Sequence, residues 1–175
     1  MPTFIGDDFV RLRRAPNNKS EVFLTLAFGD AVDALETQGK FRKLRALTYF
    51  DGHAEGWARN DPPLSLRDTG VLKVSMVDVQ QGDGLILESP TGKIVLIDGG
   101  DNKLFARHVA ARFRHRGGTA AAPLPVDAII ITHGDADHFD GLNDLRRSET
   151  DSGLADRKRV FVHPRRVYHN GLVKF

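Results

Sequence analysis

The sequence contains no cysteine and no long hydrophobic run. The lack of cysteine excludes disulfides, thiolate metal ligands and a cysteine nucleophile, so any bound metal must be held by His, Asp or Glu. No apolar stretch approaches the roughly 20 residues that a membrane-spanning helix needs. The opening residues, MPTFIGDDFVRLRR, carry acids and arginines where a secretory signal would be apolar. We therefore expect a cytoplasmic protein with no membrane partner.

The charge is nearly balanced, with a formal net charge of +2 over 175 residues. Such a small excess does not by itself indicate nucleic-acid binding. A hydrophobic content of 41% is sufficient to build a core, either in one medium domain or in two small ones. The chain is therefore expected to be globular.

Residues 1–62 contain short alternating segments separated by Pro, Asn, Gly and Asp, which is typical of a small all-β unit. Five short strands fit this region. We expect their inward faces to come from Val10 and Leu12, from Val22, Leu24 and Leu26, from Val32 and Leu35, from Phe41 and Leu44, and from the Trp57 segment.

The order of these signals resembles the bacterial Src-homology-3-like barrel. The matching elements are VRLRRAP, EVFLTL, the Gly29–Asp30 turn, AVDALE, and Gly56 followed by Trp57. The resemblance implies a β-barrel over residues 1–62 that could bind a protein partner. Phe41, Tyr49 and Trp57 would either line a peptide groove or fill the barrel core.

Residues 63–70 combine prolines with polar residues and are predicted to form a linker. Beyond it, VLKVSMVDV, GLILES and KIVLIDGG predict an antiparallel meander. Phe105, Val109 and Phe113 recur at helical spacing and predict an amphipathic helix over about 103–115. VDAIIIT predicts a strand buried on both faces, FDGLNDLRR a short helix, and RVFVH another strand. Helices packed on a mixed sheet are expected.

The most informative stretch is ITHGDADHFDG, residues 131–141, which directly follows the apolar run. A loop that leaves a buried strand should direct His133, Asp135, Asp137 and His138 toward one point. Carboxylates so close together repel one another unless a cation lies between them, and imidazole is a common metal ligand. The alternative is a capped helix N-terminus in which Asp137 or Asp140 accepts backbone N–H bonds, but capping explains only one acid.

THGDADHFDG resembles the HxHxDH signature of the metallo-β-lactamase superfamily, with Asp135 where most members have the second His. This HxDxDH form is similar to the hydrolase domain of ComEC-type DNA-uptake proteins and their relatives. A second block, MVDVQQGDGLILESPTGKIVLIDGG, is similar to the opening of the same group. The resemblance implies an α+β chain in which residues 71–175 form the first half of an αββα sandwich.

The resemblance also implies roles for individual residues. His133 and Asp135 match the ligands of a first metal ion, and Asp137 and His138 match those of a second ion and the catalytic pair. Asp98 matches an acid that supports the ligand loop. The acids Asp78 and Asp83 either support the site as well or serve only as turn or cap residues.

The chemistry implied is hydrolysis by water held between two divalent metal ions, zinc or manganese, with magnesium also possible. The carboxylate of Asp135 favours manganese or magnesium over zinc. The preferred substrate is a phosphodiester, in nucleic acid or a nucleotide. Lactamase, thioesterase and glyoxalase-type activities remain alternatives, as do a protein-binding module with an inactive or regulatory hydrolase half and a degenerate relative.

The superfamily pattern requires a further His roughly 60 residues after the first block, whereas this chain ends 37 residues after His138. His163 and His169 come too early, and we expect neither to be the missing ligand. The remaining half of the domain is expected from downstream sequence or from another chain. Alone, residues 1–175 are expected to self-associate through an uncovered sheet edge and the apolar GLVKF end.

Overall fold

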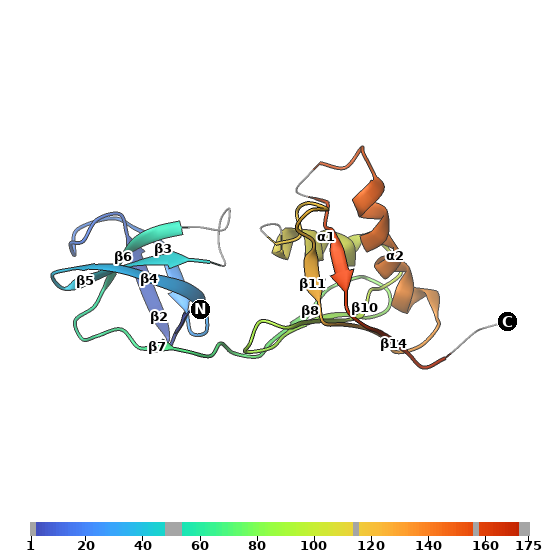
Figure 1. Cartoon of the computed structure of the whole chain (residues 1–175), viewed down its shortest axis with the longest axis horizontal. Coiled ribbons are helices and arrows are strands. Elements are labelled where there is room, and N and C mark those ends of the chain that lie inside the picture. The colour runs from blue at the N-terminus through green and yellow to red at the C-terminus, as the bar shows by residue number, and fades with distance from the viewer. Residues whose placement is uncertain (1–2, 48–53, 114–115, 156–157, 172–175) are drawn as a thin grey trace. The chain divides into compact units, whose positions relative to one another are not determined.

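The chain forms two compact units, residues 1–71 and 72–175, in a computed structural model (Figure 1). The structure describes residues 3–47, 54–113, 116–155 and 158–171. Strands dominate both units, and the two helices of the described residues lie in the second unit. Neither of these helices is long and apolar enough to cross a membrane.

The first unit is a curled, antiparallel sheet of seven strands in the order β3-β2-β6-β5-β4-β1-β7. The strands are β1 (Thr3–Ile5), β2 (Phe9–Arg13), β3 (Val22–Ala27), β4 (Ala31–Gln38), β5 (Phe41–Ala46), β6 (Ala54–Arg59) and β7 (Leu66–Arg67). The five predicted strands correspond to β2 through β6. Whether this sheet is a Src-homology-3-like barrel stays a prediction.

Alternation along the strands decides which side chains fill the core of this unit. Most of the predicted inward residues are buried: Val10, Leu12, Leu24, Leu26, Val32, Phe41 and Leu44. The prediction is wrong for Val22, which is 37% exposed, and Leu35 is only half-buried, beside a register shift between Ala34 and Thr37. In β6, Gly56 and Ala58 take the inward positions, so Trp57 is half-buried on the opposite face. Tyr49 lies outside the described residues.

The Gly29–Asp30 turn joins β3 to β4 as the sequence indicates. Gly29 has φ +83°, a conformation that favours glycine, and Asp30 accepts a hydrogen bond from the Ala27 N–H at 2.8 Å. The predicted linker, residues 63–70, includes β7, which pairs with β1. This part of the chain therefore belongs to the first sheet, and the compact units divide after Val71.

The second unit contains a five-stranded mixed sheet in the order β14-β12-β10-β9-β8. Strands β8 (Lys73–Met76), β9 (Gly84–Glu88) and β10 (Ile94–Asp98) form the predicted antiparallel meander. Strands β12 (Ala128–Ile131) and β14 (Val167–His169) add to it in parallel. A separate pair consists of β11 (Leu124–Val126) and β13 (Val162–Pro164).

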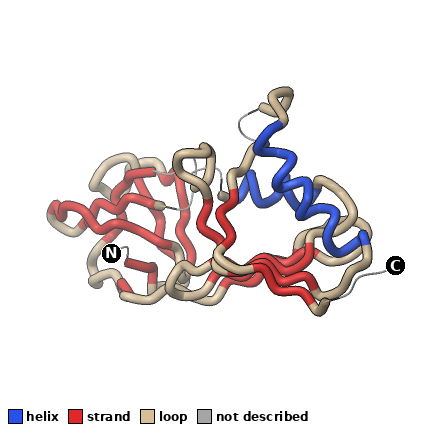
Figure 2. Tube along the Cα trace, turned by 45° about the vertical axis from the view of Figure 1, so that its right-hand side comes forward, coloured by secondary structure: helices blue, strands red, loops and turns tan. Residues whose placement is uncertain are grey.

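Helices α1 (Leu104–Arg112) and α2 (Ala136–Thr150) both cover the same face of the sheet (Figure 2). The core between the layers contains Ile86, Ile94 and Leu96 from the sheet, each 0% exposed. Phe105 and Val109 of α1 and Leu145 of α2 pack against them. The predicted helix over 103–115 is thus confirmed for its described part, while residues 114–115 lie outside the described residues.

The opposite face of the sheet is also apolar, because pairing register aligns one hydrophobic residue from each strand. That row runs Met76, Leu85, Ile97, Ile130 and Tyr168 across all five strands. Met76 is 80% exposed and Tyr168 is 49% exposed. The prediction that VDAIIIT is buried on both faces is wrong, since Ala128–Ile131 are only half-buried. No described helix of this unit covers this face.

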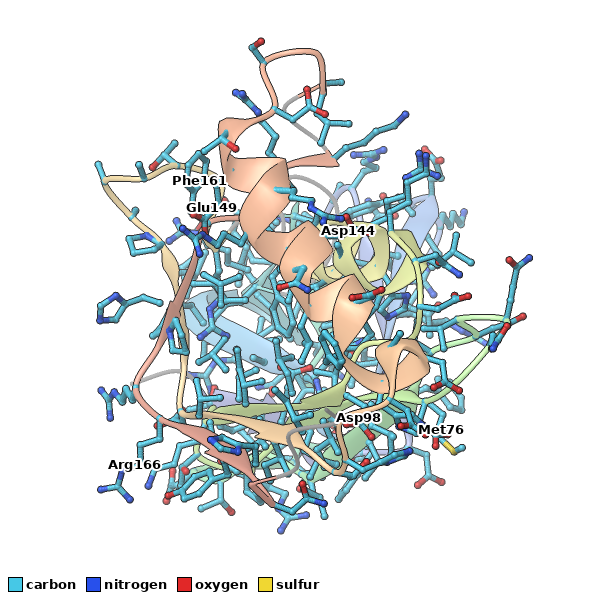
Figure 3. All side chains as sticks on the ribbon, turned by 90° about the vertical axis from the view of Figure 1, so that its right-hand side faces the viewer. Met76, Asp98, Asp144, Glu149, Phe161 and Arg166 are labelled. Atoms are coloured by element: carbon cyan, nitrogen blue, oxygen red, sulfur yellow. The ribbon has the colours of Figure 1, made fainter. Side chains whose placement is uncertain are left out.

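Two further sequence predictions need correction. RVFVH was expected to form a strand over 159–163, but β13 covers Val162–Pro164 and pairs with β11 outside the main sheet. The edge strand β14 was not predicted at all. Met76 and Arg166 lie toward opposite edges of the main sheet, with Asp98 between them (Figure 3). Residues 172–175 of the GLVKF end lie outside the described residues.

The apolar row, with its exposed ends at Met76 and Tyr168, predicts concentration-dependent self-association of residues 1–175, because burying it against a second copy removes hydrophobic surface from water. Met76→Lys should weaken that association at least about tenfold, equivalent to about 1.4 kcal/mol. Sedimentation velocity over a range of concentrations measures it. Phe9→Lys, which removes an apolar side chain that is 58% exposed in the first unit, is the control and should have little effect. A strictly monomeric wild-type chain would contradict the prediction.

Candidate metal centre

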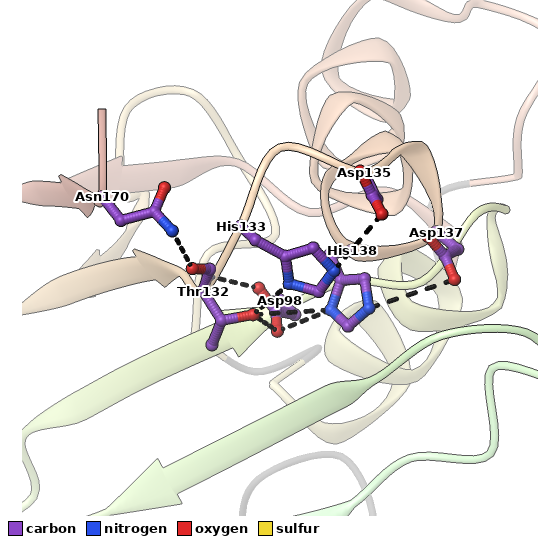
Figure 4. A network of polar contacts seen from close by, with 7 residues as sticks. All are labelled: Asp98, Thr132, His133, Asp135, Asp137, His138 and Asn170. Carbon is purple, nitrogen blue, oxygen red and sulfur yellow. Dashed lines mark hydrogen bonds and ion pairs between the residues drawn. The ribbon is translucent and has the colours of Figure 1, made fainter. Parts of the chain in front are cut away.

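The candidate site lies where β10 and β12 end and α2 begins (Figure 4). Asp98 is the last residue of β10, and His133 follows β12 after one intervening residue. The sequence predicted that the short helix follows the ligand cluster, but α2 begins at Ala136. Asp137 and His138 therefore lie on the first helical turn, which fixes their spacing more rigidly than a loop would.

Asp98 is the buried centre of the site, with 1% of its surface exposed. Its Oδ1 accepts the Thr132 N–H at 2.8 Å, and its Oδ2 accepts the Thr132 hydroxyl at 2.6 Å. Oδ2 also lies 2.9 Å from His138 Nδ1. An ionised carboxylate can only accept hydrogen bonds, so His138 carries its proton on Nδ1. One side chain thus joins β10, the loop after β12 and α2.

Thr132 extends this network to the second histidine. Its Oγ1 lies 3.1 Å from His133 Nδ1. Because the single hydroxyl proton is donated to Asp98, Oγ1 can only accept from His133, which places the proton of that ring on Nδ1 as well. Both imidazoles are thereby left with an unprotonated Nε2 in their neutral forms, the state in which histidine binds metal ions.

The two Nε2 atoms each lie near a carboxylate without a hydrogen bond to it. His133 Nε2 is 3.7 Å from Asp135 Oδ2, and His138 Nε2 is 3.9 Å from Asp137 Oδ2. The ring centroids of the two histidines are 3.8 Å apart. The structure thus gathers the four predicted ligand residues into two neighbouring imidazole–carboxylate pairs.

The charge around His138 favours a cation. Burial by itself lowers the pKa of His138, but the hydrogen bond to Asp98 and the charges of Asp98, Asp137 and Asp83 outweigh it, so the pKa is raised above its ordinary value. A positive charge at this ring is stabilised whether a proton or a metal ion supplies it. The two compete for Nε2, so metal binding should weaken as the pH falls.

Asp83 comes to this site from the loop between β8 and β9. Ligand atoms of Asp83, Asp98 and His138 lie within 4.8 Å of one another, close enough to share a cation. Asp83 and Asp78 are both exposed, but Asp78 lies outside this group and accepts the Gln80 N–H at 3.0 Å, as in a turn. Of the two acids whose roles the sequence left open, only Asp83 lies within this group.

Close backbone packing at glycines holds these segments together. A Cβ on Gly82 would lie 1.6 Å from the Asp137 carbonyl oxygen, and one on Gly141 would lie 1.8 Å from the Gly99 carbonyl oxygen. The Gly99 N–H also donates to the His138 carbonyl at 2.7 Å. The glycines of QQGD, IDGG and FDG therefore let two loops approach the first turns of α2 at a distance that side chains would prevent.

The alternative explanation by helix capping does not match the geometry. Asp137 and Asp140 lie inside α2, and its N-cap is instead Asp135, whose side chain makes no cap hydrogen bond. The donor set of carboxylates and unprotonated imidazole nitrogens instead fits a divalent cation. Sequence reasoning missed Thr132, whose only signal was its place directly after the strand. It also missed Asn170, which donates from Nδ2 to the Thr132 carbonyl at 2.7 Å.

Comparison with known families gives a match that covers most of the second unit. Residues 93–170, which include β10 through β14, match the family model described as a beta-lactamase superfamily domain. The match supports assignment of this region to the general class of hydrolases. No curated protein and no solved structure gives a significant match to the chain.

Asp98→Ala should destabilise the second unit by about 3 kcal/mol or more, because two Thr132 donors and the His138 Nδ1–H would lose a buried acceptor. Chemical denaturation followed by circular dichroism measures the loss. Asp101→Ala removes an exposed acid from the loop that follows β10 and should change stability by no more than about 0.5 kcal/mol. Equal effects from both substitutions would contradict the role assigned to Asp98.

Gly141→Ala tests the backbone packing, because helix propensity and the close contact with Gly99 change the stability in opposite directions. Helix propensity alone would make alanine more stable by about 1 kcal/mol. The contact with the Gly99 carbonyl should instead make it less stable by about 2 kcal/mol. Gly153→Ala is the control, since the one atom near its Cβ is a side-chain oxygen at 3.2 Å. Thermal unfolding that shows a stabilised Gly141→Ala would exclude the close approach.

Proposed function

We propose that this chain carries the metal-binding half of a metal-dependent hydrolase that acts on phosphodiesters. The observation that supports it most is the hydrogen-bond network in which Asp98 contacts His138 directly and His133 through Thr132. It leaves both Nε2 atoms unprotonated beside Asp135 and Asp137. The match of residues 93–170 to the beta-lactamase superfamily domain supports the same class of enzyme.

In this proposal His133 and Asp135 hold one divalent ion, and Asp137 and His138 hold a second. Asp83 is an additional carboxylate for the His138 side. Asp98 orients His138 and Thr132 rather than binding metal, because three donors already occupy its oxygens. Its role matches the carboxylate–histidine pairing common around metal sites.

The bound ions would supply an activated water and neutralise negative charge that develops on the substrate. The chain's own contribution is to fix geometry: α2 sets the spacing of Asp137 and His138, and the Gly82 contact holds Asp83 beside them. Burial of Asp98 and His138 keeps water from competing for the orienting hydrogen bond. No covalent nucleophile is needed.

The choice of a phosphodiester rests on the ComEC-like motif and on Asp135 in place of a second imidazole. An extra carboxylate hardens the first site and moves its preference toward manganese or magnesium. Lactamase, thioesterase and glyoxalase-type activities use related ligands, so the metal site alone does not choose among them. Nucleic acid or a nucleotide is the proposed substrate.

The proposed partner is suggested by the apolar row of Met76, Leu85, Ile97, Ile130 and Tyr168, which is exposed at Met76 and Tyr168. We propose that the remaining half of the hydrolase domain, from downstream sequence or another chain, covers this face and supplies the missing ligands.

The alternative is that the first unit recruits a protein through its sheet, with the second unit regulatory. Trp57 lies on the outer face of the sheet, with Lys43 Nζ 6.0 Å from its ring centroid. This position favours a role of Trp57 in binding a protein partner over a role in the core.

Metal binding tests the proposal directly. The metal-stripped chain should bind Mn²⁺ in calorimetry, and His138→Ala should weaken binding by at least about tenfold, or 1.4 kcal/mol, because a ligand is lost. The exposed His163, which lies on β13, provides the control His163→Ala. Failure of the wild-type chain to bind Mn²⁺ or Zn²⁺ would sink the proposed function.

A companion variant, Asp135→His, tests the metal preference. Replacing the carboxylate with imidazole should shift relative affinity from Mn²⁺ toward Zn²⁺. The substrate is tested separately with the wild-type chain: in the presence of Mn²⁺, the rates of hydrolysis of DNA, a cyclic dinucleotide and a thioester are compared. Turnover of the thioester alone would replace the phosphodiesterase assignment with a thioesterase.

A further inference from the structure

His169 is placed beside the metal-binding segments by the register of the parallel strands. Ile97 pairs with Ile130, so continuing that register by one residue sets Asp98 beside Ile131. Ile131 in turn pairs with His169 of β14. Residues in register on adjacent strands point to the same face, and neighbouring strands lie about 4.8 Å apart. His169 therefore lies two strands from Asp98, on the face that α2 covers.

The end of β14 is tied to the metal-binding loop by a further contact. Asn170, the next residue, donates from Nδ2 to the Thr132 carbonyl at 2.7 Å (Figure 4). Thr132 is the residue that orients His133 through its hydroxyl. The position of His169 is thus linked to the segment that holds the metal-binding histidines, although its side chain is exposed.

The protonation of His169 differs from that of His133 and His138. The Gly171 backbone N–H donates to His169 Nδ1 at 3.1 Å. Because a backbone N–H is always a donor, Nδ1 must be the acceptor, and the neutral ring then carries its proton on Nε2. A protonated Nε2 cannot bind a metal ion, but it can donate a hydrogen bond.

The charge of the site calls for such a donor. Asp83, Asp98, Asp135 and Asp137 surround the histidines, and their negative charge would repel an anionic substrate wherever a metal ion does not neutralise it. A neutral N–H donor at the edge of this group can bind a substrate oxygen without competing with the metal ions for the carboxylates.

From this geometry we infer that His169 is a substrate-binding residue, not a metal ligand. Its Nε2–H donates to an anionic oxygen of the substrate, such as a phosphoryl oxygen, beside the metal site. The inference rests on the proposed function in one respect, namely that the substrate is a phosphodiester. The tautomer and the position of His169 do not depend on that function.

Two-dimensional ¹H–¹⁵N NMR of the histidine rings tests the tautomers at alkaline pH in the metal-free chain. His138 should show a protonated Nδ1 and His169 a protonated Nε2. A protonated Nδ1 on His169 would overturn the inference whether or not the protein binds metal.

The second measurement is the affinity for inorganic phosphate, with and without Mn²⁺, by NMR titration. His169→Ala should weaken phosphate binding by about five- to tenfold while Mn²⁺ affinity stays unchanged. His169→Gln should restore part of it, since the amide can donate. His163→Ala is the matched control and should bind phosphate like the wild type.

The outcomes separate the two proposals. Loss of Mn²⁺ affinity in His169→Ala would make His169 a ligand and overturn the inference. Equal phosphate affinity in all variants would also overturn it. If the wild type binds no metal, the proposed function fails, but a His169-dependent phosphate affinity in the metal-free chain would still support the anion-binding role. An unaffected phosphate affinity there would refute it.

Discussion

The site depends on one buried carboxylate at the end of a strand. Asp98 has φ 52°, a left-handed conformation that aspartate tolerates better than most residues, and Gly99 and Gly100 follow it. The chain therefore turns away from the sheet while the carboxylate stays under α2. There it accepts from Thr132 and His138 and, through Thr132, determines the proton position on His133. Without this acceptor, the two rings would have no shared orientation.

The helices cover the main sheet on one face only, and the site lies on that covered face, at the end of β10. Both helices pack on the face that contains Ile86, Ile94 and Leu96. The other face carries an equally apolar row that is exposed at Met76 and Tyr168. Parallel strand pairs such as β10–β12 are usually covered on both faces, so this half-covered sheet has the character of one layer of a larger assembly.

Sequence patterns predicted the elements well where one physical requirement dominated. Helical spacing of Phe105, Val109 and Phe113 identified α1, and alternation identified the meander and five strands of the first unit. Sequence patterns failed where packing against neighbouring side chains decided which residues are buried. The sequence left open whether Trp57 fills the core or lines a groove, and the small residues beside it take the interior, where a Cβ on Gly56 would already lie 2.6 Å from the Phe23 ring. The edge strand β14 is short and directly follows two arginines, so the sequence gave no clear strand signal there.

The sequence by itself determined the residue types and spacing of the proposed metal site, because HxDxDH following an apolar strand leaves few other uses for two imidazoles and two carboxylates. It also indicated Asp98 as a supporting acid. Tertiary structure decided the rest: that Asp137 and His138 lie on a helix, that Asp83 joins them while Asp78 serves a turn, and which ring nitrogen carries each proton. The proton positions depend on hydrogen bonds between residues 34 to 40 positions apart, which local sequence patterns cannot specify.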